Sequence, residues 1–158
     1  MSARLIHRNR EVLTEVLYFS AVAAHLSDSE ITKQRTFLTH LEASGVAIEL
    51  GRFAKRQRQC SNCNRQYTVF EEKETDVAIA TALLRIAFMQ SAEKILLFSA
   101  DTDLLPAIKM ARAVNPELEI ILVSTPPFLR ASYGRMVNFV DGQIQLSKAL
   151  IDQYQFGA

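Results

Sequence analysis

Three aspartates, Asp76, Asp101 and Asp103, are the residues best suited to metal-dependent chemistry in this chain. Asp101 and Asp103 follow the apolar run 94–99, which predicts a buried strand, and functional groups of open α/β sheets gather beyond the carboxyl ends of strands. Asp76 lies near the start of a long apolar helix upstream, so it could converge with the other two. Clustered carboxylates repel one another, and Mg²⁺ or Mn²⁺ relieves that repulsion, activates water and neutralises phosphate charge.

Each of these acids also has a purely structural explanation. Asp103 is placed to cap the helix predicted from about Leu104 to Val114, and Asp76 is placed to interact favourably with the dipole of its own helix. Residue types and spacing alone leave both explanations open.

Two cysteines, Cys60 and Cys63, form a second candidate site. Their spacing is that of a metal knuckle or a redox pair. A structural zinc site has four ligands, so the pair would be half of one, completed across a dimer by two more cysteines or by a histidine. Unmetallated loop thiols are the alternative. A redox role is disfavoured, because a thioredoxin-type pair opens a helix after a strand.

The cysteines lie in a polar stretch, at about 52–67, that contains no acid and is predicted to be a loop or a small excursion. Its basic residues could hold single-stranded RNA near the acids by contacting phosphates, with Phe53 and Tyr67 as stacking surfaces. A solvated surface loop is the alternative, because most runs of charge are no more than that. The predicted RNA-binding residues are Arg52, Lys55, Arg56 and Arg58.

The elements that would position these residues alternate between strands and helices, the pattern of a parallel sheet covered on both faces. Strands are predicted at 16–23, 46–53, 94–99 and 119–123, with a short edge strand at 139–146 and a closing helix at about 147–154.

The first predicted helix has recognisable ends. Ser27 and Glu30 have the spacing of a capping box, and Gly45 stands where a left-handed residue would end the helix. In the helix that follows the acids, Pro106 suits the first turn.

Length and composition predict a single domain over residues 1–158. The 18 Lys and Arg residues nearly balance the 17 Asp and Glu residues, so net charge gives no reason to expect a polyanion partner. No apolar run approaches the roughly 18 to 20 residues of a membrane span, and the start lacks the apolar core of a signal peptide. A cytoplasmic protein without a membrane partner is therefore expected.

Two sequence blocks carry a family resemblance: Lys73-Glu-Thr-Asp-Val77 and Ser99-Ala-Asp-Thr-Asp-Leu-Leu-Pro106. Together they resemble the signatures of the NYN domain family, a branch of the PIN-like nuclease superfamily, and are similar to bacterial proteins of the LabA type. The resemblance implies a three-layer, Rossmann-like α/β fold with a mostly parallel sheet. It also implies metal-dependent hydrolysis of RNA phosphodiesters, with Asp76, Asp101 and Asp103 at the positions of family acids.

The start of the sequence departs from the family pattern. The family begins with a central strand that ends in an Asp, whereas this sequence begins MSARLIHRNR, so that strand and its Asp are expected to be missing. Their loss would remove a metal ligand and leave strand edges unpaired. Reduced activity is therefore expected, and a homodimer or a partner chain could complete the sheet.

The sequence thus predicts a metal-dependent ribonuclease that uses Mg or Mn and acts on RNA, with Zn as a second metal if the cysteine pair binds it. The alternative is a catalytically inactive RNA-binding or protein-interaction module. A phosphatase of the haloacid dehalogenase type is disfavoured. Its Asp-x-Asp motif opens the domain and normally continues to Thr or Val, where Leu105 stands here.

Overall fold

The computed structural model describes residues 10–99, 101–125 and 131–153. The chain forms two compact units, one ending at Ile79 and the other starting at Ala80. In the described residues the strands form two three-stranded sheets, β1-β2-β3 and β4-β5-β6, and every strand pair except β2 with β3 is parallel. These helices and mostly parallel strands confirm the predicted α/β, Rossmann-like fold class. The single domain expected for residues 1–158 stays a prediction.

The unit that ends at Ile79 starts with strand β1 (Leu17–Ala21), crosses through helix α1 (Asp28–Ala43) and returns in strand β2 (Ala47–Gln59), parallel to β1. Gln34 in α1 ties the helix to the chain at the end of β1. Its side-chain amide donates to the carbonyl of Ala21 at 2.8 Å and accepts from the N–H of Ala23 at 3.0 Å. Helix and strand are thereby held at a fixed separation.

Both predicted ends of α1 are confirmed. Ser27 is the N-cap, and its side chain and that of Glu30 form the reciprocal hydrogen bonds of a capping box. Gly45, just beyond the helix, has a φ of 83°, a left-handed conformation that glycine adopts at little cost.

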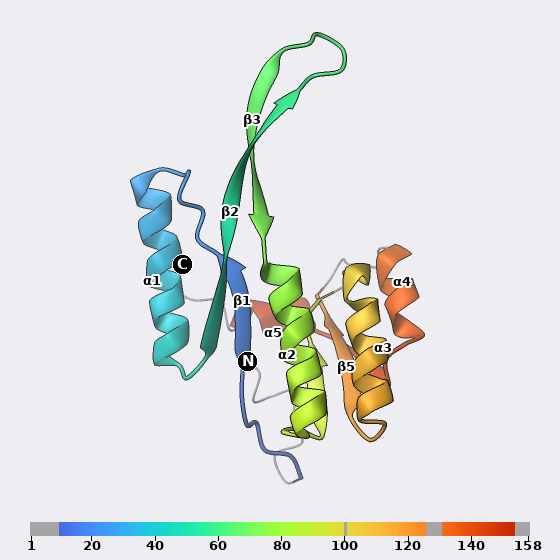
Figure 1. Cartoon of the computed structure of the whole chain (residues 1–158). Helices are drawn as coiled ribbons and strands as arrows, with labels where there is room; N and C mark the ends of the chain where they lie inside the picture. Colours follow the sequence, from blue (N-terminus) through green and yellow to red (C-terminus); the bar gives the residue numbers. More distant parts are fainter. Residues whose placement is uncertain (1–9, 100, 126–130, 154–158) are drawn as a thin grey trace. The chain divides into compact units, whose positions relative to one another are not determined.

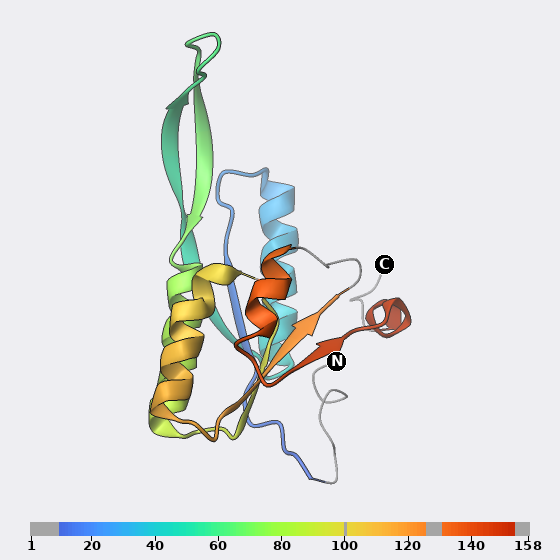
Figure 2. The same ribbon diagram turned by 90° about the vertical axis from the view of Figure 1, so that its right-hand side faces the viewer.

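Strand β2 changes partner partway along its length. Its first residues pair with β1 as far as Gly51, and from Arg52 to Gln59 it pairs with the antiparallel strand β3 (Gln66–Lys73). The prediction of a loop at 52–67 is therefore wrong, because most of that stretch belongs to a long β-hairpin. We call residues 52–73 the ribbon. It extends past the N-terminal start of α1 in both views (Figures 1 and 2).

The ribbon looked like a loop because solvent reaches both of its faces. Every residue from Lys55 to Thr68 is exposed except Cys60, which is half-buried. The alternation of apolar and polar residues that identifies a strand arises only when one face is buried. The remaining signal is the β-forming run Tyr67-Thr-Val-Phe70 that follows the cysteines.

Gly51 lies where the backbone of β2 comes closest to the junction between β3 and helix α2 (Thr75–Met89). A Cβ at Gly51 would lie 2.4 Å from the carbonyl oxygen of Lys73 and 2.9 Å from Oγ1 of Thr75. Only a glycine allows this approach without moving the backbone. The start of α2 is therefore positioned by a backbone contact with β2.

In the unit that starts at Ala80, β5 lies between β4 and β6 and is parallel to both. Its four central residues, Ile120 to Val123, are all buried, so both faces of the strand are covered, as in the interior of a parallel sheet. No helix was predicted from the sequence between the strands at 119–123 and 139–146, but helix α4 (Ala131–Val137) lies there. Pro126 and Pro127, which follow β5 in sequence, lie outside the described residues. After α2 the elements are β4 (Lys94–Leu97), the 3-10 turn η2 (Thr102–Leu104), α3 (Leu105–Val114), β5 (Glu119–Ser124), α4 (Ala131–Val137), β6 (Gly142–Gln145) and α5 (Lys148–Gln153).

Asp141 joins three parts of this unit. Its Oδ2 accepts hydrogen bonds from the Arg112 guanidinium and, at 2.9 Å, from the backbone N–H of Ile120. The guanidinium of Arg112 holds the pKa of Asp141 below its ordinary value. Helix α3, the start of β5 and the turn before β6 are thus linked through one carboxylate.

The expected absence of an N-terminal strand concerns residues 1–9, which lie outside the described residues. Within the described part of the chain, β1 and β4 are outer strands of their sheets. No helix among the described residues is both long and apolar enough to cross a membrane.

Gly51→Ala should destabilise the protein by about 1–3 kcal/mol, because the new methyl group must displace the Lys73 carbonyl. Gly134→Ala in α4 is the matched control, since a Cβ there has no neighbour within 4 Å. That substitution should stabilise the helix by about 0.5–1 kcal/mol. Urea unfolding followed by circular dichroism measures both changes. Equal stability of Gly51→Ala and the wild type would contradict the backbone contact.

Candidate active site and nucleic-acid interface

Asp101 and Asp103 follow β4 and flank Thr102, the first residue of η2. Asp101 is the N-cap of this turn, and its Oδ1 accepts the backbone N–H of Asp103 at 2.9 Å. The backbone N–H of Asp101 in turn donates to Oγ of Ser99 at 3.2 Å. Both aspartates are exposed. We call them the acidic pair.

Asp103 does not cap α3, as had been suggested; the capping hydrogen bond here is made by Asp101, and it caps η2. Helix α3 starts at Leu105 with Pro106 in its first turn, as expected, and its N-cap Leu104 makes no side-chain capping bond. Among the described residues, the Asp103 carboxylate has neither a hydrogen-bond donor nor an ion-pair partner. Both carboxylate oxygens of Asp103 are thus without a partner among the described residues, whereas one carboxylate oxygen of Asp101 accepts a backbone hydrogen bond.

Asp76 lies in the first turn of α2 and is exposed. It belongs to the unit that ends at Ile79, and the acidic pair belongs to the other unit. Within either unit, the described residues contain no group of three or more His, Cys, Asp or Glu side chains arranged to hold a metal ion. The convergence of Asp76 with the acidic pair therefore stays a prediction.

The turn before Asp76 is held by side chains on both sides. Glu74 has a φ of 80°, an uncommon conformation for a residue with a side chain, and its carboxylate forms an ion pair with Arg52 at 2.6 Å. The hydroxyl of Thr75 donates to Glu72 at 2.5 Å. Arg52, predicted to bind RNA, thus also fixes the turn from which Asp76 projects.

The four predicted RNA-binding residues divide between the two faces of the ribbon. Side chains alternate along a strand, so Arg52, Arg56 and Arg58 share one face and Lys55 lies on the other. Tyr67 is opposite Arg58 in the register and is 47% exposed, so its ring is open to a stacking base on the arginine face.

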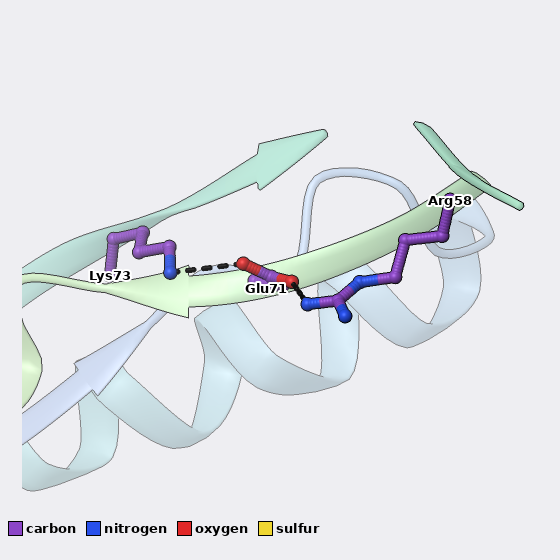
Figure 3. Close-up of polar contacts among 3 residues, drawn as sticks. All are labelled: Arg58, Glu71 and Lys73. Carbon is purple, nitrogen blue, oxygen red and sulfur yellow. Dashed lines mark hydrogen bonds and ion pairs between the residues drawn. The ribbon is translucent and has the colours of Figure 1, made fainter. Parts of the chain in front are cut away.

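Glu71 organises the arginine face of the ribbon. Its carboxylate binds the Arg58 guanidinium with one oxygen and the Lys73 ammonium, at 3.0 Å, with the other (Figure 3). Arg58, with a further contribution from Lys73, lowers the pKa of Glu71 to about 2. The carboxylate is therefore ionised at neutral pH and bridges the two cations.

These ion pairs distinguish the four predicted RNA-binding residues. Arg52 and Arg58 are paired with carboxylates, whereas Lys55 and Arg56 form no ion pair among the described residues. Arg52 and Arg58 are more than half exposed, and exposed ion pairs contribute at most about 1 kcal/mol. An RNA phosphate could therefore displace the carboxylate from Arg52 or Arg58. Arg56 could bind a phosphate without displacing any carboxylate.

His25 was not singled out from the sequence, yet it braces the base of the ribbon. Its ring stacks on Phe70 at 3.9 Å between centroids and meets Phe53 edge-on at 5.0 Å. Phe53, expected as a stacking surface for RNA, is thus already in contact with another ring. A lone histidine after a strand gives no sequence signal for this contact.

Cys60 and Cys63 lie in the turn at the far end of the ribbon. Both are free thiols, with Cys60 half-buried and Cys63 exposed. Asp76 follows the other end of the ribbon, in helix α2, so the cysteines and Asp76 are separated by the length of β3.

A hollow of about 260 Å³ in the unit that starts at Ala80 contains none of the predicted site residues. Its lining includes Lys109, Arg112 and Phe139, and the Lys109 ammonium lies 4.4 Å from the centre of the Phe139 ring. Arg112 is paired with Asp141. The residues that line this hollow include no acid, so the hollow is not part of the acidic site.

Glu71→Gln should lower the thermal unfolding midpoint at pH 7, because it removes the anion between Arg58 and Lys73. The pKa of Glu71 falls from 4.5 to about 2 on folding, so its contribution is present above pH 4.5 and is lost as pH falls toward 2. The difference from the wild type should therefore shrink across that range. Glu49→Gln in β2 is the control, and a difference that does not change with pH would contradict this role.

Comparison with known proteins places the chain in a family. The sequence profile of the NYN domain matches residues 3–140. No curated protein matches the chain. A solved ribokinase from Giardia lamblia is similar with a TM-score of 0.48 and 13% sequence identity, over 87% of this chain and 44% of that one, so the chain spans less than half of its length. Because the profile covers most of the sequence, the chain belongs to the NYN domain family, a branch of the PIN-like nuclease superfamily.

Proposed function

We propose that this protein is a metal-dependent ribonuclease in which Asp76, Asp101 and Asp103 bind Mg²⁺ or Mn²⁺ and the ribbon binds RNA. The acidic pair carries the proposal, because it presents two exposed carboxylates directly after the carboxyl end of β4. That is the edge of a parallel sheet where ligands bind. Membership of the NYN family supports a nuclease-type function for these acids.

The donor set fits a hard divalent cation. Asp103 offers both carboxylate oxygens, and Asp101 keeps Oδ2 available because only its Oδ1 accepts the N–H of Asp103. This backbone hydrogen bond also fixes the orientation of the Asp101 carboxylate. When bound, the cation supplies Lewis acidity at the phosphate and a nucleophilic water. Asp76 is the proposed third ligand.

The ribbon supports the choice of a nucleic acid as substrate. From Arg52 to Phe70 it contains no acid, and Arg56, Arg58 and Tyr67 lie on one face. Arginines bind phosphates and an exposed tyrosine stacks on an unpaired base, a combination suited to single strands. The same face leads to Arg52 and the turn that carries Asp76. RNA held along it would approach the first of the three acids.

Asp103→Asn should reduce Mn²⁺-dependent cleavage of a labelled single-stranded RNA by about a hundredfold or more, because a metal ligand and its charge are lost. Asp101→Asn should behave similarly while keeping the turn, since asparagine also caps. Asp152→Asn, an exposed acid in α5, is the control and should cleave at the wild-type rate. Unchanged cleavage by both acidic-pair variants would overturn the assignment.

The same assay separates the enzyme from a catalytically inactive RNA-binding module. An inactive module would bind the labelled RNA and leave it intact with Mg²⁺ or Mn²⁺ present. The enzyme would cleave the RNA and stop when the metal is chelated. Measuring binding and cleavage on the same sample distinguishes the two functions.

Arg56→Ala should weaken RNA binding and reduce the slope of log affinity against log salt by about 0.7, the value for one phosphate contact to a single strand. Arg35→Ala in α1 is the matched control, because it removes an arginine that is also exposed but is not part of the ribbon. Fluorescence anisotropy at several salt concentrations measures both variants. The same slope for Arg56→Ala and Arg35→Ala would remove the ribbon from the RNA interface.

A further inference from the structure

The turn at the far end of the ribbon, residues 60–65, has a defined backbone conformation. The N–H of Cys60 donates to the carbonyl of Arg65, and the N–H of Asn64 donates to the carbonyl of Cys60, each at 2.9 Å. The side chain of Gln59 closes the turn by donating to the carbonyl of Asn64 at 3.1 Å. Asn64 has a φ of 56°, a left-handed conformation that asparagine tolerates. We call these residues the tip.

This conformation brings the two cysteines together. The hydrogen bond from the N–H of Asn64 back to the carbonyl of Cys60 closes the intervening residues into one turn, so Cys60 and Cys63 lie close in space. Two cysteines at this spacing in a closed turn can supply two thiolates to one metal ion.

We propose that the tip is half of a tetrahedral zinc site, and that two copies of this chain join tip to tip, with Cys60 and Cys63 of each copy binding one shared ion. Thiolate sulfurs at this spacing are typical zinc ligands, and a structural zinc site has four of them. This inference goes beyond the ribonuclease proposal and does not depend on it.

The remaining ligands are assigned to a second copy because of where the tip lies. The other side chains of the tip are Ser, Asn and Arg, which are not ligands of structural zinc sites. His25 contacts Phe70, which pairs with Lys55 in the register. Lys55 precedes Cys60 by a length of strand of roughly 15 Å, so His25 is out of reach. The exposed end of the ribbon has room for a second tip.

Charge explains why this contact should need the metal. The ribbon contains no acid between Arg52 and Phe70, so two tips brought together without an ion would repel each other through Arg65 and Arg56, which form no ion pair among the described residues. One zinc ion with four thiolates is a doubly negative centre, which converts this repulsion into attraction. The dimer should therefore form with zinc and dissociate without it.

The ribbon itself would benefit from such a site. A two-stranded hairpin is marginally stable alone, and both faces of this one are exposed from Lys55 to Thr68, Cys60 excepted. Its ion pairs lie toward the base, at Glu71 and Glu74. A metal that binds only the folded turn stabilises that turn and gives the outer ribbon a fixed end.

The test uses the full chain with Zn²⁺ and then with Co²⁺ as a spectroscopic substitute. Elemental analysis should find one zinc ion for two chains, and analytical ultracentrifugation should find a dimer that a chelator converts to monomer and added zinc restores. The cobalt form should show thiolate-to-metal charge transfer and tetrahedral d–d bands. Cys60→Ser should lose both the bands and the dimer, and Ser61→Ala, a tip substitution that changes no ligand, should keep them.

Three results would overturn the proposal. One ion per chain in a monomer would show that a single copy completes the site. No bound ion, with Cys60 and Cys63 joined in a disulfide, would show that the pair is oxidised instead. A dimer that survives both the chelator and Cys60→Ser would show that copies meet elsewhere. Circular dichroism of Cys60→Ser confirms that the variant is folded, and none of these measurements depends on RNA cleavage.

Discussion

The hydrogen-bonding demand of β2 determines how the unit that ends at Ile79 is built. The backbone groups of a strand must be paired, and β2 meets this demand by pairing with β1 as far as Gly51 and with β3 from Arg52 onward. The change of partner occurs where a side chain would collide with the carbonyl of Lys73. The parallel pairing with β1 requires the crossover through α1. The antiparallel pairing with β3 forms the ribbon and brings the start of α2 beside β2.

Local chemistry in the sequence was sufficient to predict some elements. Ser27, Glu30 and Gly45 mark the ends of α1 because capping bonds and left-handed residues act within a few positions. The apolar run 94–99 was predicted to be a buried strand, but only Leu97 of β4 is buried, because β4 is an outer strand of its sheet in the described part of the chain. The strand predicted at 119–123 is instead the one covered on both faces, with Ile120 to Val123 buried. The ribbon was missed because it has no buried face, so its sequence carries no alternation to detect.

The candidate site was predictable to a different extent. The position of Asp101 and Asp103 after β4 follows from the strand they end, and the structure places them there. The division of labour between them was not predictable, since it depends on one hydrogen bond from the N–H of Asp103 to Asp101. Likewise, the arginines of the ribbon were visible as charges, but the carboxylates that pair with Arg52 and Arg58 lie 22 and 13 residues away in sequence. Pairing at that distance depends on strand register.

Because both faces of the ribbon are exposed, its length can change without changing the stability of the rest of the unit. Inserting two residues into each of its strands would keep every side chain on its original face and move the turn outward by roughly 7 Å. No core contact would be lost, because the outer ribbon contributes none of the buried hydrophobic residues. The reach of this element, and so the spacing between whatever it touches and the fold that carries it, can therefore change in evolution or by design through insertions alone.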